Sequence, residues 1–414
     1  MSVTTEFDNS TLINENNFPE KRKSIPLIAR KAFDLLLGIE TGKLFVRLPG
    51  GKTYHFDSGR PGPEGYLILH NWKLARKVIL AGTIGVAETY MDGDWDSPDV
   101  TQMLEFFLEN KGVYDNVAEQ SILTGVLANF RHWLNRNDRK GAQRNIAAHY
   151  DLGNSFYKLW LDPSMTYSSA IYEDGANSLE RAQEDKYRSL ATRMGIKPDS
   201  HVLEIGCGWG GFAEFVTKEI GAKVTGLTIS REQLNFARKR LAKAGLQDRA
   251  ELKFQDYRDE TGKYDHIASI EMFEAVGKEY WPTYFRKINE CLKPGGTAGL
   301  QIITIEDASF DSYSARTDFI QRYIFPGGML PSPAALSSVT ALEGLKLASE
   351  RIFPQDYAKT LREWRLRFWE KWDEIKVLGF DERFKRMWEF YLFYCEAGFK
   401  SESIDVRQMF YKHS

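Results

Sequence analysis

The sequence is poor in cysteine and has no pattern that would pair the few cysteines it contains. Its 414 residues include three of them, Cys207, Cys291 and Cys395, which are odd in number and far apart. No CxxC pair is present, so a disulfide framework and a zinc site are both disfavoured. We therefore predict no metal site and a protein of the reducing cytoplasm.

Long apolar runs and an excess of one charge are also missing. No apolar segment approaches the roughly 20 residues that a membrane-spanning helix needs. The net charge of −2 gives no reason to expect a nucleic-acid partner. Residues 1–24 have no apolar core of the kind found in signal peptides, and we predict a disordered tail there. The 43% of hydrophobic residues nevertheless suffices for a core of normal size.

After this tail, the pattern of apolar residues predicts a small α+β domain over 25–114. Two short strands flank the turn Pro49-Gly50-Gly51, a third strand starts at 65, and helices are expected at 72–80 and 100–108. The glycines at 82 and 85 should break the first of these helices. Residues 115–147 read as a helical, basic connector.

From 148 to 414, apolar runs alternate with helical patterns. Strands are predicted at 201–205, 223–228, 250–254, 264–270 and 297–304, and helices between them include 211–220, 231–244 and 278–292. Such alternation is typical of βαβ units. It predicts an α/β fold with a Rossmann-like, parallel-type sheet and helices on both faces.

The strongest local signal is a buried strand that ends in a glycine-rich turn and passes straight into a helix. Residues 202–205 are followed by Gly206-Cys207-Gly208-Trp209-Gly210-Gly211. Glycines are needed where a cofactor presses on the backbone after a first strand. The spacing departs from the G-x-G-x-x-G of dinucleotide sites and resembles that of class I methyltransferases, which use S-adenosylmethionine (SAM). This favours SAM over NAD or a purely structural turn, with Gly206 and Gly208 lining the pocket.

The next two strand ends extend this prediction. Ser230 and Gln233 form a capping box at the start of a helix, and Thr228 and Gln233 are expected at the rim of the pocket near the ribose. At the third strand end, Gln255 is a further candidate and Asp256 is expected near the adenine amino group. The alternative for each is an ordinary cap or turn residue.

Six motifs in order then carry a family resemblance. They are His149-Tyr150-Asp151-Leu152-Gly153-Asn154, Met165-Thr166-Tyr167-Ser168, the segment 203–211, residues 255–259, Met272-Phe273-Glu274-Ala275-Val276-Gly277 and residues 323–328. Together with 85–95, they resemble the cyclopropane-fatty-acyl-phospholipid synthase family. The resemblance implies methyl(ene) transfer from SAM to cis double bonds of phospholipid acyl chains, forming cyclopropane chains.

The resemblance also implies the roles of individual residues. Tyr167 and Ser168 match cofactor contacts. The implied catalytic residues are Tyr150, Ser169, Glu274, Gln301 and Tyr357. Glu274 would help to hold a bicarbonate that acts as the base, with Ser169, Gln301 and Tyr357 as donors. No other carboxylate in the matched motifs is expected to take this role.

Three positions depart from the family pattern. Ser169 stands where the family has Cys, Gln301 where it often has His, and Ala275 where His is common. Gln donates a hydrogen bond to an anion but does not take up a proton near neutral pH, so bicarbonate binding should be weakened. The alternative product is then a methyl- or methylene-branched chain.

The expected substrate lies in a membrane, so we predict peripheral association with its inner face and, from the resemblance, a homodimer. The basic connector 131–144 and the aromatic stretch 364–372 are candidates for docking, the latter with a plain core helix as its alternative. A non-enzymatic lipid-binding protein and a small-molecule or protein methyltransferase are the rival classes. The intact glycine turn disfavours the first, and the aromatic region downstream disfavours the second.

Overall fold

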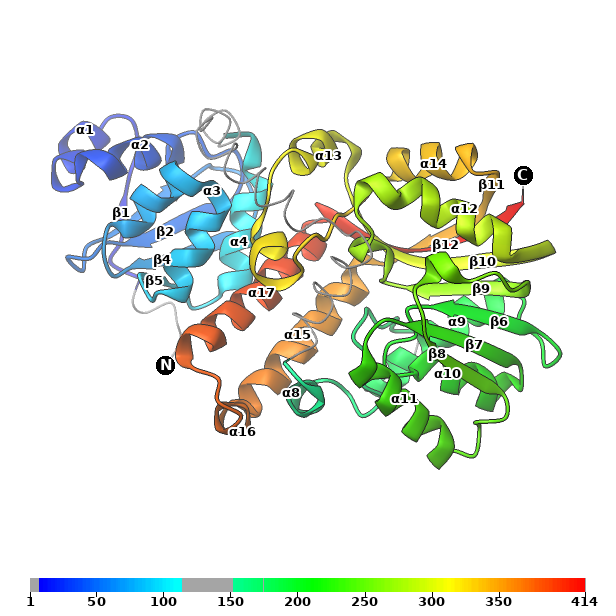
Figure 1. Cartoon of the computed structure of the whole chain (residues 1–414). Helices are drawn as coiled ribbons and strands as arrows, with labels where there is room; N and C mark the ends of the chain where they lie inside the picture. Colours follow the sequence, from blue (N-terminus) through cyan, green and yellow to red (C-terminus); the bar gives the residue numbers. More distant parts are fainter. Residues whose placement is uncertain (1–6, 114–151, 174, 414) are drawn as a thin grey trace. The chain divides into compact units, whose positions relative to one another are not determined.

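The computed structural model describes residues 7–113, 152–173 and 175–413, and their contacts divide the chain into two units (Figure 1). The first unit combines Met1–Phe130 with Gly379–Ser403. The second combines Arg131–Leu378 with Ile404–Ser414. We describe each unit by itself.

The first unit is built on a five-stranded sheet with the order β1-β3-β2-β4-β5. Side chains alternate between buried and half-buried along β2 and β4, so one face of the sheet forms a core. The strands are β1 (Thr11–Leu12), β2 (Lys43–Arg47), β3 (Thr53–Asp57), β4 (Glu64–Leu69) and β5 (Trp95–Asp96). The helices are α1 (Phe18–Lys21), η2 (Arg22–Ser24), α2 (Leu27–Leu36), α3 (Lys73–Met91), α4 (Val100–Glu109) and α17 (Glu382–Lys400).

The first unit differs from the sequence prediction at two points and agrees with it at a third. The expected tail carries β1, which pairs with β3, and its residues Phe7, Ile13 and Phe18 are buried, because the sheet offers them an apolar surface. The predicted break after residue 80 is confirmed, because Gly82 has non-helical backbone angles (φ 54°, ψ −134°) and divides α3 into two helical parts. Helix α17, expected within the second domain, packs on α3 and α4 of the first unit.

The second unit contains a seven-stranded sheet with the order β11-β12-β10-β9-β6-β7-β8. The strands are β6 (His201–Ile205), β7 (Lys223–Thr228), β8 (Ala250–Phe254), β9 (Tyr264–Ile270), β10 (Leu292–Ile305), β11 (Leu345–Ile352) and β12 (Ile404–His413). The pairs from β10 through β9, β6 and β7 to β8 are parallel, whereas β12 runs antiparallel to both β10 and β11. All five strands predicted for residues 148–414 are therefore confirmed.

Helices cover both faces of this sheet, as predicted. One buried cluster joins the sheet to α12 (Trp281–Cys291) and α14 (Pro333–Leu342), and the other joins it to α9 (Leu179–Met194), α10 (Gly211–Phe215) and α11 (Arg231–Lys243). Figure 1 shows these two sets of helices on opposite sides of the strands. The remaining helices are α8 (Asn154–Trp160), η3 (Val216–Ile220), η4 (Tyr257–Asp259), η5 (Phe273–Ala275), η6 (Lys278–Tyr280), α13 (Asp307–Ser314), η7 (Ile320–Ile324), α15 (Pro354–Glu370) and α16 (Trp372–Val377).

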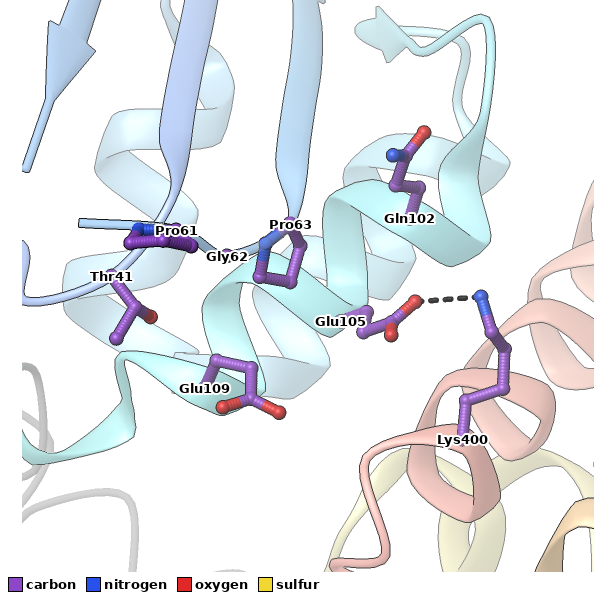
Figure 2. Close-up of a pocket in the computed structure, with 8 residues that line it drawn as sticks. All are labelled: Thr41, Pro61, Gly62, Pro63, Gln102, Glu105, Glu109 and Lys400. Atoms are coloured by element: carbon purple, nitrogen blue, oxygen red, sulfur yellow. Dashed lines mark hydrogen bonds and ion pairs between the residues drawn. The ribbon is translucent and has the colours of Figure 1, made fainter. Parts of the chain in front are cut away.

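A pocket lies in the first unit between the loop before β4 and helices α4 and α17 (Figure 2). It is lined by Thr41, Pro61, Gly62, Pro63, Gln102, Glu105, Glu109 and Lys400. The ammonium group of Lys400 lies 2.7 Å from the carboxylate of Glu105, so this ion pair ties α17 to α4. None of the residues predicted for the functional site lines this pocket.

Two further searches cover only the residues that the structure describes. Within those ranges, every helix is too short or too polar to cross a bilayer. In the same part of the chain, no group of three or more histidine, cysteine or acidic side chains is arranged to hold a metal ion.

Candidate functional site

The glycine-rich turn lies where the strand order of the second sheet reverses. Strand β6 pairs with β7 on one side and with β9 on the other, so the connections leave it in opposite directions. Ligands of open α/β sheets bind at such a point, beyond the carboxyl ends of the strands. The turn itself is fixed because the backbone N–H groups of Gly206 and Cys207 both donate to the Leu227 carbonyl at 2.9 Å.

The glycines of this turn are required for different reasons. Three of the four have positive φ, at 82° for Gly206, 50° for Gly208 and 82° for Gly210. A Cβ on Gly206 would lie 2.7 Å from Met272, and one on Gly210 would lie 2.9 Å from Ala237. A Cβ on Gly208 would meet nothing within 4 Å. Gly208 therefore borders open space in front of the turn, as a cofactor pocket requires.

The end of β7 presents the two residues predicted for the pocket rim. The Thr228 hydroxyl donates to Gln233 Oε1 at 3.0 Å, and both side chains are buried. Ser230 caps α11 by accepting the Gln233 N–H at 3.3 Å. Half of the predicted capping box is thus confirmed, while the Gln233 side chain turns toward Thr228 instead.

The end of β8 places Gln255 and Asp256 on separate partners. The Gln255 amide donates to Glu260 at 3.0 Å, and Asp256 accepts from the guanidinium group of Arg258 at 2.8 and 2.9 Å. Asp256 also caps the short helix η4. This cap and ion pair agree with the alternative interpretation of Asp256 as a turn residue, and its adenine contact stays a prediction.

The segment 167–170 connects the sheet to an aromatic wall. The Tyr167 ring lies 5.5 Å from the ring of Tyr157, 5.5 Å from that of Trp160 and 5.3 Å from that of Trp364. The Trp364 ring in turn lies 6.1 Å from that of Tyr357. These side chains form a continuous, largely buried aromatic cluster, which we call the aromatic wall.

The neighbouring Ser168 is held by a buried lysine. Lys186 Nζ donates to Ser168 Oγ at 2.6 Å, and both residues are buried. Burial lowers the pKa of Lys186, and the charges of Glu271, Asp162 and Glu204 oppose this shift. Lys186 is a site residue that the motifs did not indicate.

The central carboxylate of the site is Glu271. It accepts the Ser169 N–H at 2.8 Å, the Gln301 amide at 2.8 Å and the Tyr357 hydroxyl at 2.6 Å. Ser169, Gln301 and Tyr357 are thus brought together as predicted, but around Glu271 rather than Glu274. The expectation for Glu274 compares it only with carboxylates inside the matched motifs, and Glu271 directly precedes the motif 272–277, so that comparison does not include it.

Glu271 could have been found from the strand pattern. It follows the apolar strand β9 directly, at the carboxyl edge where parallel strands present ligand-binding residues. Its φ of 49° lies in the left-handed region, which residues other than glycine rarely adopt. Such a conformation concentrates at functional sites.

Glu274 lies nearby with a different environment. One carboxylate oxygen accepts the Ile303 N–H at 2.5 Å, and the other is buried without a hydrogen-bond partner. Burial, together with the charge of Glu271, raises the pKa of Glu274 to about 8. These surroundings favour the protonated form of the side chain, and its catalytic role stays a prediction.

Two further predictions concern Tyr150 and the segments proposed for membrane docking. Tyr150 and the basic connector 131–144 lie outside the described residues. In the aromatic stretch 364–372, Trp364, Phe368 and Trp372 are buried, whereas Leu366 and Trp369 are exposed. One face of the stretch therefore packs in the core, and docking through its other face stays a prediction.

The residues at the switch point fit SAM, whereas the donors expected for bicarbonate have another partner. Gly208 faces open space, and one oxygen of the buried Glu204 has no hydrogen-bond partner and is available to a donor. The three groups expected to donate to bicarbonate already donate to Glu271. The strand order, the glycine turn and its place in the sheet define a class I SAM-dependent methyltransferase.

Comparison with known proteins specifies this class. Residues 137–409 match the family of mycolic acid cyclopropane synthetases. The chain is 40% identical to the tuberculostearic acid methyltransferase UfaA1 of Mycobacterium tuberculosis, over 99% of this chain and 98% of that protein. It is 34% identical to the cyclopropane-fatty-acyl-phospholipid synthase of Escherichia coli, over 81% and 84% of the two chains.

A solved structure agrees with this. The mycolic acid cyclopropane synthase CmaA1, complexed with SAH and CTAB, has a TM-score of 0.61 and 28% identity, covering 65% of this chain and 97% of that one. The chain belongs to the cyclopropane synthase family, a family of enzymes that act on lipids, and it is a SAM-dependent methyltransferase.

Proposed function

We propose that the protein transfers a methyl group from SAM to the cis double bond of unsaturated acyl chains in membrane phospholipids. The observation that carries this proposal is the wall formed by Glu271, Tyr357, Trp364 and Tyr167. Methyl transfer to an alkene leaves a positive charge on carbon, and carboxylates and aromatic faces stabilise such a charge where water is excluded.

The chain's own residues then have distinct tasks. When bound, SAM supplies an electrophilic methyl group on a sulfonium sulfur. Gly208 leaves space for the cofactor in front of the turn, and Gly206 leaves room for the side chain of Met272, the neighbour of Glu271. The aromatic wall orients the apolar chain and excludes water, so the alkene is held in line with the methyl group. A carboxylate accepts the proton that the cation must lose.

Two products remain candidates, and a different relative supports each. The relative that is similar along the whole chain is named for methyl transfer, which favours a branched product. The Escherichia coli relative is named for cyclopropane formation, which supports ring closure as predicted from the sequence. We favour the branched product, because Glu271 holds the donors predicted for bicarbonate and so changes the position of the base.

We further propose peripheral association with the inner face of the membrane and a homodimer. A substrate embedded in a bilayer requires the enzyme to dock on its surface. The basic connector 131–144 is the segment we propose for this task, since basic side chains attract anionic lipid head groups.

The function is tested by following a labelled methyl carbon. The protein is incubated with SAM carrying a ¹³C methyl group and vesicles of a phospholipid with one cis double bond; vesicles of a saturated phospholipid are the control. We expect mass spectrometry to find the label in the unsaturated chains only. Carbon NMR then separates a ring methylene, an exocyclic methylene and a methyl group. Label in the head group, in protein or in neither lipid would contradict the proposal.

A further inference from the structure

The groups around Glu271 form a set of hydrogen-bond donors of the kind that binds an anion. In this protein the anion is the side-chain carboxylate of Glu271. Three donors from three separate parts of the chain converge on one carboxylate: the Ser169 N–H, the Gln301 amide and the Tyr357 hydroxyl. Ser169, Gln301 and Tyr357 are all buried. A donor set of this kind binds a small oxyanion such as bicarbonate when no carboxylate fills it.

The orientation of the Gln301 amide is fixed from behind. Gln408, on the adjacent strand β12, donates to Gln301 Oε1 at 3.2 Å, and its own Oε1 accepts the Ser189 hydroxyl at 2.9 Å. The Gln301 nitrogen therefore points to Glu271. The set of donors is preorganised for an acceptor rather than assembled by chance.

The backbone at Glu271 supports the same conclusion. A φ of 49° suits glycine and is unfavourable for a residue with a side chain. The chain adopts it because this conformation turns the residue from the end of β9 into the donor set. The protein thus accepts local strain in order to place a carboxylate there.

We propose that the carboxylate of Glu271 takes the place of an external bicarbonate and is itself the proton acceptor of the reaction. This inference rests on the proposed methylation of an alkene. It assigns the reaction an internal base, so turnover should not need bicarbonate.

The step balances without a further reagent. One alkene carbon bonds the methyl carbon as the carbon–sulfur bond breaks, and the other alkene carbon becomes a cation. A C–H bond then gives its proton to Glu271. In ring closure, the electron pair of this C–H bond forms the third carbon–carbon bond of the cyclopropane. In the other route, a hydride first shifts within the chain, and the electron pair then forms a carbon–carbon double bond. A saturated branch would need a hydride from a separate reductase.

The surroundings keep Glu271 available as a base. Burial raises the pKa of its carboxyl group, and the hydrogen bonds from Tyr357, Gln301 and Ser169, with the charge of Lys186, oppose that rise. The ionised form thus has three partners that a protonated carboxyl group would satisfy less well.

Two substitutions of Glu271 test its two proposed tasks separately, namely accepting the proton and occupying the set of donors. Glu271→Gln keeps the size of the side chain but cannot take up a proton. Glu271→Gly suits the positive φ and opens the donor set. Glu402, whose φ is 56° in the first unit, offers a matched control, because Glu402→Gly makes the same change at the same kind of backbone position. Thermal melting establishes that each variant folds.

Turnover is measured in buffer freed of carbon dioxide and again with added bicarbonate. We expect the wild type and Glu402→Gly to be equally active in both. Glu271→Gln should lose about 100-fold or more in kcat, with its affinity for SAM retained, and bicarbonate should not restore it. Glu271→Gly should be as inactive without bicarbonate and recover as bicarbonate is added. A wild type that needs bicarbonate, or an active Glu271→Gln protein, would overturn the inference.

A binding measurement decides the site independently of the substrate. Carbon NMR of ¹³C-bicarbonate should show binding to Glu271→Gly but not to the wild type or Glu402→Gly. Binding to the wild type would overturn the assignment. If the wild type methylates no unsaturated chain, the proposed function fails, and this measurement alone decides whether Glu271 fills the anion site.

Discussion

Gly208 shows at the scale of one residue how a backbone position serves a ligand. Its missing Cβ faces open space, whereas Gly206 and Gly210 are required by their contacts with Met272 and Ala237. We predict that Gly208→Val weakens SAM binding at least tenfold, because the branched side chain enters the cofactor pocket. Calorimetric titration with SAM measures this.

The control for Gly208→Val is Gly195→Val at the end of α9. Gly195 also has a positive φ, 74°, and open space at its Cβ. Both variants should lose about 1–2 kcal/mol of stability from backbone strain, and only the first should lose SAM affinity. Equal SAM affinity in the two proteins would exclude Gly208 from the pocket.

The buried carboxyl group of Glu274 makes stability depend on pH. Its pKa, raised to about 8, exceeds the ordinary value of 4.5, so between these values the folded protein binds more protons than the unfolded chain. The free energy of unfolding should therefore fall as pH rises through this window. Glu274→Gln keeps an acceptor for the Ile303 N–H and removes the titration, so the fall should be less steep.

Urea denaturation between pH 5 and pH 8 tests this expectation. Glu251→Gln changes an exposed carboxylate on β8 and should retain the slope of the wild type. An unchanged slope in the Glu274→Gln protein would show that Glu274 ionises normally in the folded state.

At the scale of an element, the first turn of α11 connects helix stability with the cofactor site. Ser230 caps this helix and fixes the backbone of Gln233, whose side chain contacts Thr228. We predict that Ser230→Ala lowers the free energy of unfolding by about 1 kcal/mol and also weakens SAM binding, because Gln233 loses its position.

Ser178 provides a matched control at the start of α9. It accepts the Arg181 N–H at 3.3 Å, the same distance as the cap of α11. Ser178→Ala should cost similar stability in chemical denaturation and leave SAM binding unchanged. If both variants bind SAM as the wild type does, Gln233 is not a cofactor contact.

At the scale of the whole molecule, the open question is how the enzyme reaches a lipid chain. We predict that charge reversal of Arg136, Arg139 and Lys140 in the basic connector weakens binding to anionic vesicles and makes the remaining binding less sensitive to salt. Vesicle sedimentation at several salt concentrations measures this effect. Activity on detergent-dispersed substrate should suffer less.

Three exposed lysines of the second unit form the control set. Charge reversal of Lys218, Lys223 and Lys243 changes the net charge by the same amount outside the connector. If both triple variants bind vesicles equally, net charge rather than the connector governs docking.

The sequence by itself determined the features that depend on short-range patterns, namely strands, turns and motifs. The alternation of apolar runs specified β6 to β10, and the spacing of the glycines specified the turn after β6 and its cofactor. Ordered motifs specified the family. These features depend on residues close together in the chain, where side-chain periodicity and backbone sterics act directly.

Only the tertiary structure decided which carboxylate the three donors contact. Ser169 and Tyr357 lie 102 and 86 positions from Glu271 in the chain, so no local pattern shows that their donors meet there rather than at Glu274. The same holds for the buried N-terminal segment and for α17, which find their apolar surfaces in the first unit. Motif matching aligns residues along the chain, whereas hydrogen bonding and burial depend on which surfaces meet after folding.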